Sequence, residues 1–163
     1  MNIKPIMTLL CGQSDTVHAL AHACEVARFA SQPDNYWVRT STDPEFSNYV
    51  VANCSEKPLV YTEETAFTSE YYAKAGEALD KGFKALGFDE NCEADMDTFT
   101  KNLFTIARDV YLLLGTKLNQ PSTVLAVPRT IEKDDQFILP LAKAFGIKVR
   151  FISNKPGVFN YEL

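Results

Sequence analysis

Short apolar runs alternate with longer segments of helical periodicity along this chain of 163 residues, and the alternation restricts the fold more than any other feature. Residues 6–10 are apolar at four of five positions, as in a strand that is buried on both faces of a parallel sheet. Residues 123–127 repeat this pattern near the other end of the chain. Strand-like runs that are separated by helical segments predict βαβ units and a mostly parallel sheet.

The predicted layout has five strands and five helices. We expect strands at residues 6–10, 36–40, 57–62, 123–127 and 147–152. We expect helices at residues 15–30, 43–53, 69–86, 97–114 and 133–145, the last with a bend at Pro140. With right-handed crossovers, this order predicts a single α/β domain over residues 1–163. We expect a three-layer Rossmann-like or flavodoxin-like open sheet of mostly parallel strands, with helices on both faces.

Two helix starts are predicted from local sequence. Ser14 or Asp15 is expected to cap the first helix, because either side chain can accept hydrogen bonds from the free N–H groups of its first turn. Asp43 followed by proline is expected to start the second helix, since proline fits the first helical position.

The two histidines stand four residues apart on the first predicted helix, a spacing that can hold a metal ion. Residues 17, 20, 24 and 27 form the expected apolar stripe of this helix, and His18 and His22 lie on the opposite face. We therefore expect both imidazoles to face solvent. The four cysteines form no C-x-x-C pair, so we expect reduced thiols, no metal site and no cofactor.

The composition limits the classes of partner. With 46% hydrophobic and 23% charged residues, it is that of an ordinary globular protein. A formal net charge of -5 disfavours nucleic acid and anionic membranes as partners. No apolar run approaches the roughly 20 residues of a membrane span, and the first residues lack the roughly 7–15-residue core of a signal peptide. We therefore expect a cytoplasmic protein.

In an open α/β sheet, ligands bind beyond the carboxyl ends of the strands, near the point where the strand order reverses. The segments after the predicted strands are rich in hydroxyl groups and carry two arginines, which suits a small polar or phosphorylated ligand. The expected ligand-binding residues are Gly12, Gln13, Ser14, Asp15, Arg39, Thr40, Ser41, Arg129 and Thr130. The alternative is that these segments are plain connecting turns, which are commonly polar.

The turn at residues 11–15 is the most suggestive of these segments. Gly12 permits close approach of the backbone to a ligand, and the helix N-terminus that follows attracts anions. The turn has neither the glycines of a dinucleotide-binding fingerprint nor the lysine of a phosphate-binding loop. A cysteine phosphatase would need an arginine six positions after Cys11, where Val17 stands. We therefore expect Cys11 to be a buried structural cysteine.

Glu63 and Glu64 follow the third predicted strand. A carboxylate at this position suits transfer or hydrolysis at a sugar carbon, as a nucleophile or a general base. Only one of the two can face the cleft, and we take Glu63 as the catalytic candidate. The alternative is a solvated acidic turn.

We predict that the protein binds a nucleotide-like or phosphorylated small molecule at the carboxyl ends of its strands, with Arg39 and Arg129 holding the anionic groups. Any enzyme activity is expected to be that of a transferase or hydrolase, because no dinucleotide fingerprint is present. The alternative is a non-catalytic interaction or oligomerisation module, in which an exposed tyrosine at residue 71 or 72 contacts another protein or a second copy of the chain.

Overall fold

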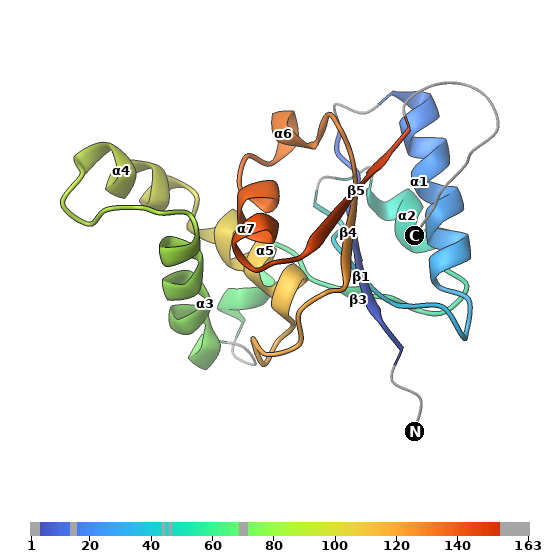
Figure 1. Cartoon of the computed structure of the whole chain (residues 1–163), viewed down its shortest axis with the longest axis horizontal. Helices are drawn as coiled ribbons and strands as arrows, with labels where there is room; N and C mark the ends of the chain where they lie inside the picture. Colours follow the sequence, from blue (N-terminus) through green and yellow to red (C-terminus); the bar gives the residue numbers. More distant parts are fainter. Residues whose placement is uncertain (1–3, 14–15, 44, 46, 69–71, 154–163) are drawn as a thin grey trace.

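The computed structural model describes residues 4–13, 16–43, 45, 47–68 and 72–153. Its centre is a sheet of five parallel strands in the order β3-β2-β1-β4-β5 (Figure 1). The strands are β1 (Ile6–Leu9), β2 (Trp37–Thr40), β3 (Leu59–Val60), β4 (Val124–Pro128) and β5 (Lys148–Ile152). The chain builds outward from β1 to β3 and then crosses to the other side of β1, so the strand order reverses between β1 and β4. The predicted open α/β sheet is confirmed.

Helices cover both faces of the sheet, and alternate residues of β1 point to the two layers. Met7 and Leu9 enter a core with α1 (Val17–Ala30) and α2 (Ser47–Ala52). Leu10 enters the other core, which contains α3 (Tyr72–Ala85), α5 (Leu103–Leu114) and α7 (Ile138–Ala144). The Thr8 hydroxyl donates to the Leu112 carbonyl at 2.6 Å and so ties α5 directly to the central strand. The remaining short elements are η1 (Thr65–Phe67), α4 (Glu93–Lys101) and α6 (Ile131–Asp134).

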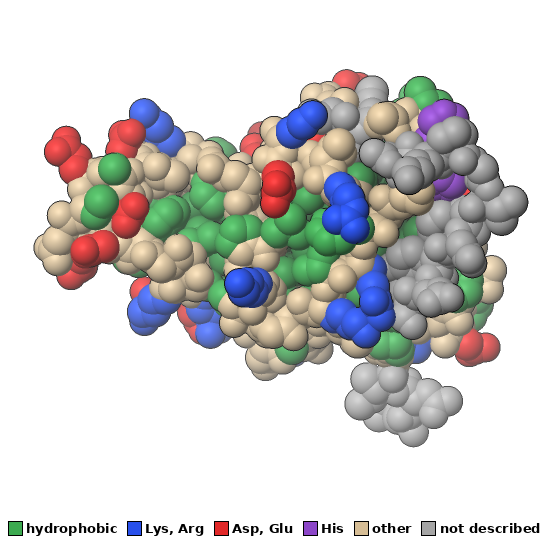
Figure 2. Space-filling view, turned by 45° about the horizontal axis from the view of Figure 1, so that its top comes forward, with side chains coloured by type: hydrophobic (Ala, Val, Ile, Leu, Met, Phe, Trp, Pro, Cys, Tyr) green, Lys and Arg blue, Asp and Glu red, His purple; other side chains and the backbone are tan. Residues whose placement is uncertain are grey.

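The α4 helix projects away from the sheet (Figure 1) and buries none of its residues. Acidic side chains gather at this projecting end in Figure 2. In the part of the chain that the structure describes, no helix is long and apolar enough to cross a membrane.

The predicted helix at residues 97–114 is wrong in its extent, because it consists of two helices that meet at Asn102. The Asn102 side-chain amide donates to the Thr98 carbonyl at 2.8 Å, and its backbone has a φ of -123°. A side chain that competes for backbone hydrogen bonds breaks a helix in this way. Apolar periodicity continues across the break, which is why the sequence pattern hid it.

The predicted bend at Pro140 is also wrong. The break lies earlier, between α6 and α7, where the Asp135 carboxylate accepts from the N–H groups of Phe137 and Ile138 at 2.8 and 3.3 Å. Asp135 thus ends α6 and fixes the turn that leads into α7. Pro140 then falls in the first turn of α7, where its missing N–H removes no helical hydrogen bond.

The α2 helix begins at Ser47 rather than near Asp43. The Asp43 carboxylate accepts instead from the backbone N–H of Glu63 at 2.6 Å. Its predicted role as a helix cap is therefore wrong, because the side chain links the end of β2 to the end of β3. Pro44 lies outside the described residues.

The cap and the buried face of α1 differ from the prediction. Thr16 is the N-cap, with its hydroxyl accepting from the Ala19 N–H at 3.1 Å. Val17 is 81% exposed, whereas His22 is buried. The two histidines therefore do not share a solvent face. The helix packs instead through a stripe rich in small side chains, which let it approach the sheet closely: Ala19, His22, Ala23, Val26, Ala27 and Ala30.

Candidate functional site

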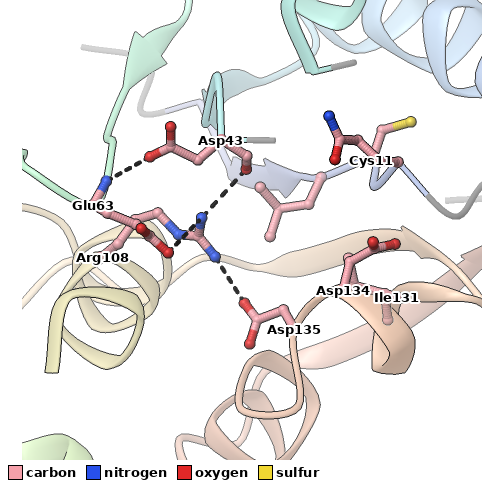
Figure 3. Close-up of a pocket in the computed structure, with 9 residues that line it drawn as sticks. Cys11, Asp43, Glu63, Arg108, Ile131, Asp134 and Asp135 are labelled. Carbon is pink, nitrogen blue, oxygen red and sulfur yellow. Dashed lines mark hydrogen bonds and ion pairs between the residues drawn. The ribbon is translucent and has the colours of Figure 1, made fainter. Parts of the chain in front are cut away.

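A pocket of about 280 Å³ opens at the carboxyl ends of the strands, where the order reverses between β1 and β4 (Figure 3). This is the place where open α/β sheets bind ligands. Its lining carries four carboxyl groups and one guanidinium, and consists of Leu10, Cys11, Gln13, Asp43, Glu63, Arg108, Ile131, Asp134 and Asp135.

Arg108 of α5 lines the pocket, and most of its N–H groups donate hydrogen bonds to oxygen atoms of the protein. Its Nε and Nη2 atoms donate to Asp109 Oδ1 at 3.2 and 3.1 Å. Nη2 also donates to Asp135 Oδ2 at 3.0 Å, and Nη1 donates to the Asp43 carbonyl at 3.3 Å. The guanidinium has five N–H donors, so about one is left to face the pocket.

The charge of Arg108 is stabilised by its carboxylates. Burial opposes the charged form, but the carboxylates of Asp109 and Asp135 outweigh burial and raise the pKa of Arg108. Burial and the neighbouring Asp135 carboxylate raise the pKa of Asp109, although Arg108 opposes the shift. Asp109 Oδ2 has no hydrogen-bond partner among the described residues. Burial and a second carboxyl group at short range therefore favour the protonated form of Asp109.

Glu63 stands at one side of the pocket, where β3 ends, and its side chain is about half exposed (Figure 3). Its Oε1 accepts from the Thr105 hydroxyl at 2.7 Å and lies 3.9 Å from Arg108 Nη1. Its backbone N–H donates to Asp43. The Glu63 carboxylate is thus held through Oε1 by two residues of α5, and the Glu63 backbone is held by Asp43.

Asp134 and Cys11 stand at the other side of the pocket (Figure 3). The Asp134 carboxylate lies against the backbone of Gly12: a Cβ added to that glycine would be 2.5 Å from Asp134 Cγ and closer still to Oδ2. The Cys11 carbonyl accepts from the Ser47 hydroxyl at 2.7 Å, and its side chain is buried in the α1 layer.

The structure brings some of the predicted site residues to this pocket. Gln13 and Glu63 line it, and Gly12 borders it through Asp134. Glu64 is exposed and does not line it. Ser14 and Asp15 lie outside the described residues, as does Tyr71.

The hydroxyl residues predicted for the site lie near the pocket but do not line it. The Thr40 hydroxyl donates to the Leu9 carbonyl at 2.6 Å, and the Ser41 hydroxyl accepts from the Asp43 N–H at 3.0 Å. Both residues are buried, so these hydroxyls support the turns rather than face the pocket. Thr130 precedes α6 and is partly exposed.

Arg39 and Arg129 do not meet. Arg39 is buried, and its Nη1 lies 3.4 Å from the Ser122 hydroxyl, just before β4 begins. The Arg129 guanidinium packs over the Phe151 ring, 4.4 Å from its centre. Phe151 pairs with Val127, and Ser122 is about 16 Å from Val127 along an extended strand. The expectation that the two arginines share one small anion is therefore not supported.

Sequence reasoning missed Arg108, Asp109 and Asp135, although a signal was present. The α5 sequence LFTIARDVYLLL carries one Arg-Asp pair, its only charged residues, within a largely apolar helix. Charged residues in such a position are rarely buried unless they are paired. Their partners follow β2, β3 and β4, so the pair marks the helix that faces the site.

The described residues contain no group of three or more histidine, cysteine, aspartate or glutamate side chains that could hold a metal ion. Comparison with models of known protein families, with curated proteins and with solved structures found no match to this chain.

Proposed function

We propose that the protein is a hydrolase or transferase that acts at a sugar carbon of a small nucleoside-like or glycoside ligand, with Glu63 as the nucleophile. The observation that supports this most is the half-exposed Glu63 carboxylate, held by Thr105 and facing Arg108 inside the pocket at the strand carboxyl ends. A carboxylate nucleophile must be accessible on one side and fixed on the other.

The size of the pocket suits this ligand class. Its volume of about 280 Å³ lies at the small end of ligand sites, which favours a monosaccharide or nucleoside over a dinucleotide. Its polar lining offers carboxylate oxygens as acceptors for the hydroxyl groups of a sugar.

The chemistry proceeds by displacement at the sugar carbon. A carboxylate oxygen of Glu63 attacks that carbon, and the bond to the leaving group breaks with its electron pair on the leaving atom, which then takes a proton from water. The resulting glycosyl ester is cleaved by water or by an acceptor hydroxyl, which releases Glu63 and gives up a proton.

The test is a panel of nucleosides and p-nitrophenyl glycosides, with released base followed by chromatography and released p-nitrophenolate by absorbance. We expect Glu63→Gln to lower turnover of any accepted substrate by at least about 1,000-fold. Glu64→Gln is the matched control, since Glu64 is the exposed neighbour outside the pocket. It should keep wild-type turnover.

Intact-mass measurement during turnover adds a second readout. The wild type should show a mass increase equal to the glycosyl group, and Glu63→Gln should not. Turnover by Glu63→Gln at the wild-type rate would overturn the proposal, as would a panel from which the wild type turns over no member.

An interaction module is the second candidate, and exposed apolar side chains favour it. Figure 2 shows apolar groups in a band across the middle of one face, extending toward the projecting end. Tyr49, Leu59 and Phe104 are each more than half exposed. Light scattering that shows a concentration-dependent oligomer, together with an inactive substrate panel, would favour this function over the first.

A further inference from the structure

The turn that leads from β1 into α1 is the feature that most limits which ligand the pocket can take. Residues 10–13 are the described part of this turn before its last residue, Thr16, which caps the 14-residue helix that follows. In open α/β sheets, this turn and helix N-terminus are where a phosphate group binds, because free backbone N–H groups attract anions. A glycine at the turn gives the ligand its close approach.

In this chain a carboxylate already fills the space beside that glycine. Gly12 is buried, and even a single added carbon would lie within 2.5 Å of Asp134 Cγ and 2.9 Å of Asp134 Cβ. Asp134 is the last residue of α6, which follows β4. The Asp134 carboxylate therefore comes from the segment after β4, across the point where the strand order reverses between β1 and β4. A phosphate could lie against Gly12 only after displacing this carboxylate.

The rest of the pocket lining also disfavours an anion, because it is rich in carboxyl groups. Asp43, Glu63 and Asp135 add three further carboxyl groups to the lining. The guanidinium of Arg108 is the one cation among the residues that line this described pocket, and its donors are largely used by Asp109, Asp135 and the Asp43 carbonyl. A phosphate would meet like charge on both sides and about one available N–H.

We infer that the pocket selects an unphosphorylated ligand, neutral or cationic, and that Asp134 is the residue that closes the β1–α1 turn to phosphate. This inference rests on the proposed function in taking the pocket as the ligand site, and it specifies the substrate class. It differs from the expectation drawn from sequence, in which the same turn was a candidate for binding an anion.

The test compares pairs that differ only in a phosphate: a nucleoside with its 5′-monophosphate, and ribose with ribose 5-phosphate. Dissociation constants come from calorimetry or ligand-observed NMR, so turnover is not needed. The wild type should bind the unphosphorylated member at least about tenfold more tightly. Asp134→Asn removes a negative charge that would repel a phosphate, from an exposed position. It should lower the ratio of the two dissociation constants, phosphorylated to unphosphorylated, about tenfold.

Glu132→Gln is the matched control, because Glu132 is an exposed acidic residue of the same short helix and does not line the pocket. It should leave the ratio unchanged. Inorganic phosphate provides an additional probe: the Asp134→Asn variant should broaden its ³¹P signal more than the wild type and Glu132→Gln do.

The outcomes separate the two proposals. Equal or tighter binding of the phosphorylated member by the wild type overturns the selectivity, even if Glu63→Gln abolishes turnover. An equal narrowing of the ratio in Asp134→Asn and Glu132→Gln overturns the role of Asp134. Unchanged turnover in Glu63→Gln overturns the catalytic role alone, while the binding ratio still stands. Absence of binding for every pair in every variant overturns the pocket as the ligand site.

Discussion

Arg108 and Arg39 are both buried on the α5 side of the sheet, yet their surroundings differ in almost every respect. Arg108 contacts the carboxyl groups of Asp109 and Asp135, which raise its pKa against the effect of burial. Arg39 has no ion pair within the described residues, and its Nε has no hydrogen-bond partner there. Burial lowers the pKa of Arg39, and Tyr61 opposes the shift.

The two sites show two ways to bury a cation. Arg39 reaches Gly115, the C-cap of α5, where the helix dipole favours a positive charge. Arg108 lies within α5, away from both ends, and is paired with its neighbour Asp109 and with Asp135 and Glu63 of other elements. Of these carboxyl groups, those of Glu63 and Asp135 line the pocket, and that of Glu63 is the more exposed. Burial of an arginine does not by itself mark a candidate site; the pocket at the strand carboxyl ends is distinguished by the carboxyl groups that line it beside Arg108.

Replacing the two arginines gives the sharpest contrast. Arg108→Met should lower the free energy of unfolding by about 3–5 kcal/mol, because it leaves buried carboxyl groups without their cation. Arg39→Met should change it by about 1 kcal/mol or less, since no carboxylate loses a partner. Urea unfolding followed by circular dichroism measures both. Equal losses of unfolding free energy in the two variants would show that the carboxyl partners of Arg108 do not set its contribution to stability.

Asp135 joins the Arg108 cluster to the start of α7, so removing its side chain should be costly. Asp135→Ala loses one charged hydrogen bond and two bonds to backbone N–H groups, and we expect a loss of about 2–4 kcal/mol. Asp135→Asn keeps an oxygen acceptor for the backbone and should lose less than half as much. If Asp135→Asn loses more than half as much stability as Asp135→Ala, the charge of Asp135 matters more than its hydrogen bonds to the backbone N–H groups.

A substitution at Gly115 tests the packing around Arg39. Its φ of 79° and ψ of 174° favour glycine, and an added Cβ would lie 2.7 Å from Arg39 Nη2. Gly115→Ala should lower the free energy of unfolding by about 1–3 kcal/mol. The loss should shrink in the Arg39→Met background, because part of it is the contact with the guanidinium. An additive double mutant would mean that backbone conformation alone sets the cost.

Asp109 should give the smallest change in the free energy of unfolding, expressed per pH unit, and the direction of that change with pH follows from its raised pKa. Its raised folded-state pKa means that it contributes stability at low pH, which is lost as pH rises from about 4 through the folded-state pKa. The wild type should therefore lose up to about 1.4 kcal/mol per pH unit relative to Asp109→Asn over that range. Unfolding in urea at several pH values measures this difference.

The exposed Asp97→Asn variant on α4 is the control for that series and should run parallel to the wild type. A difference between wild type and Asp109→Asn that stays flat or grows with pH would contradict the proposed protonation of Asp109.

The elements were predictable because they depend on local sequence. Every strand has a continuous or alternating apolar run, and residues 123–127 locate β4 within a residue of its true start. Errors arose where one polar side chain decided the outcome. Asn102 and Asp135 each end one helix and precede the next, and each acts through a hydrogen bond that apolar periodicity does not register.

The site was only partly predictable, for a related reason. Glu63 and Gln13 lie in the segments that follow β3 and β1, so their place at the sheet edge follows from the order of elements. Arg39 was misplaced because it lies inside β2 rather than after it. Its long side chain can extend toward either end of the sheet, and packing against Gly115 and Ser122 fixes that choice.

The sequence by itself determined a parallel α/β sheet, the edge at which polar residues gather and the position of Glu63 at that edge. The tertiary structure decided that Arg108 faces Asp43 from 65 residues away, that Thr105 holds Glu63 from 42 residues away, and that Asp134 lies against Gly12. Such contacts depend on strand order and on the rotation of α5 about its axis. Both are set by packing of the whole domain, because no local preference selects which side chains meet.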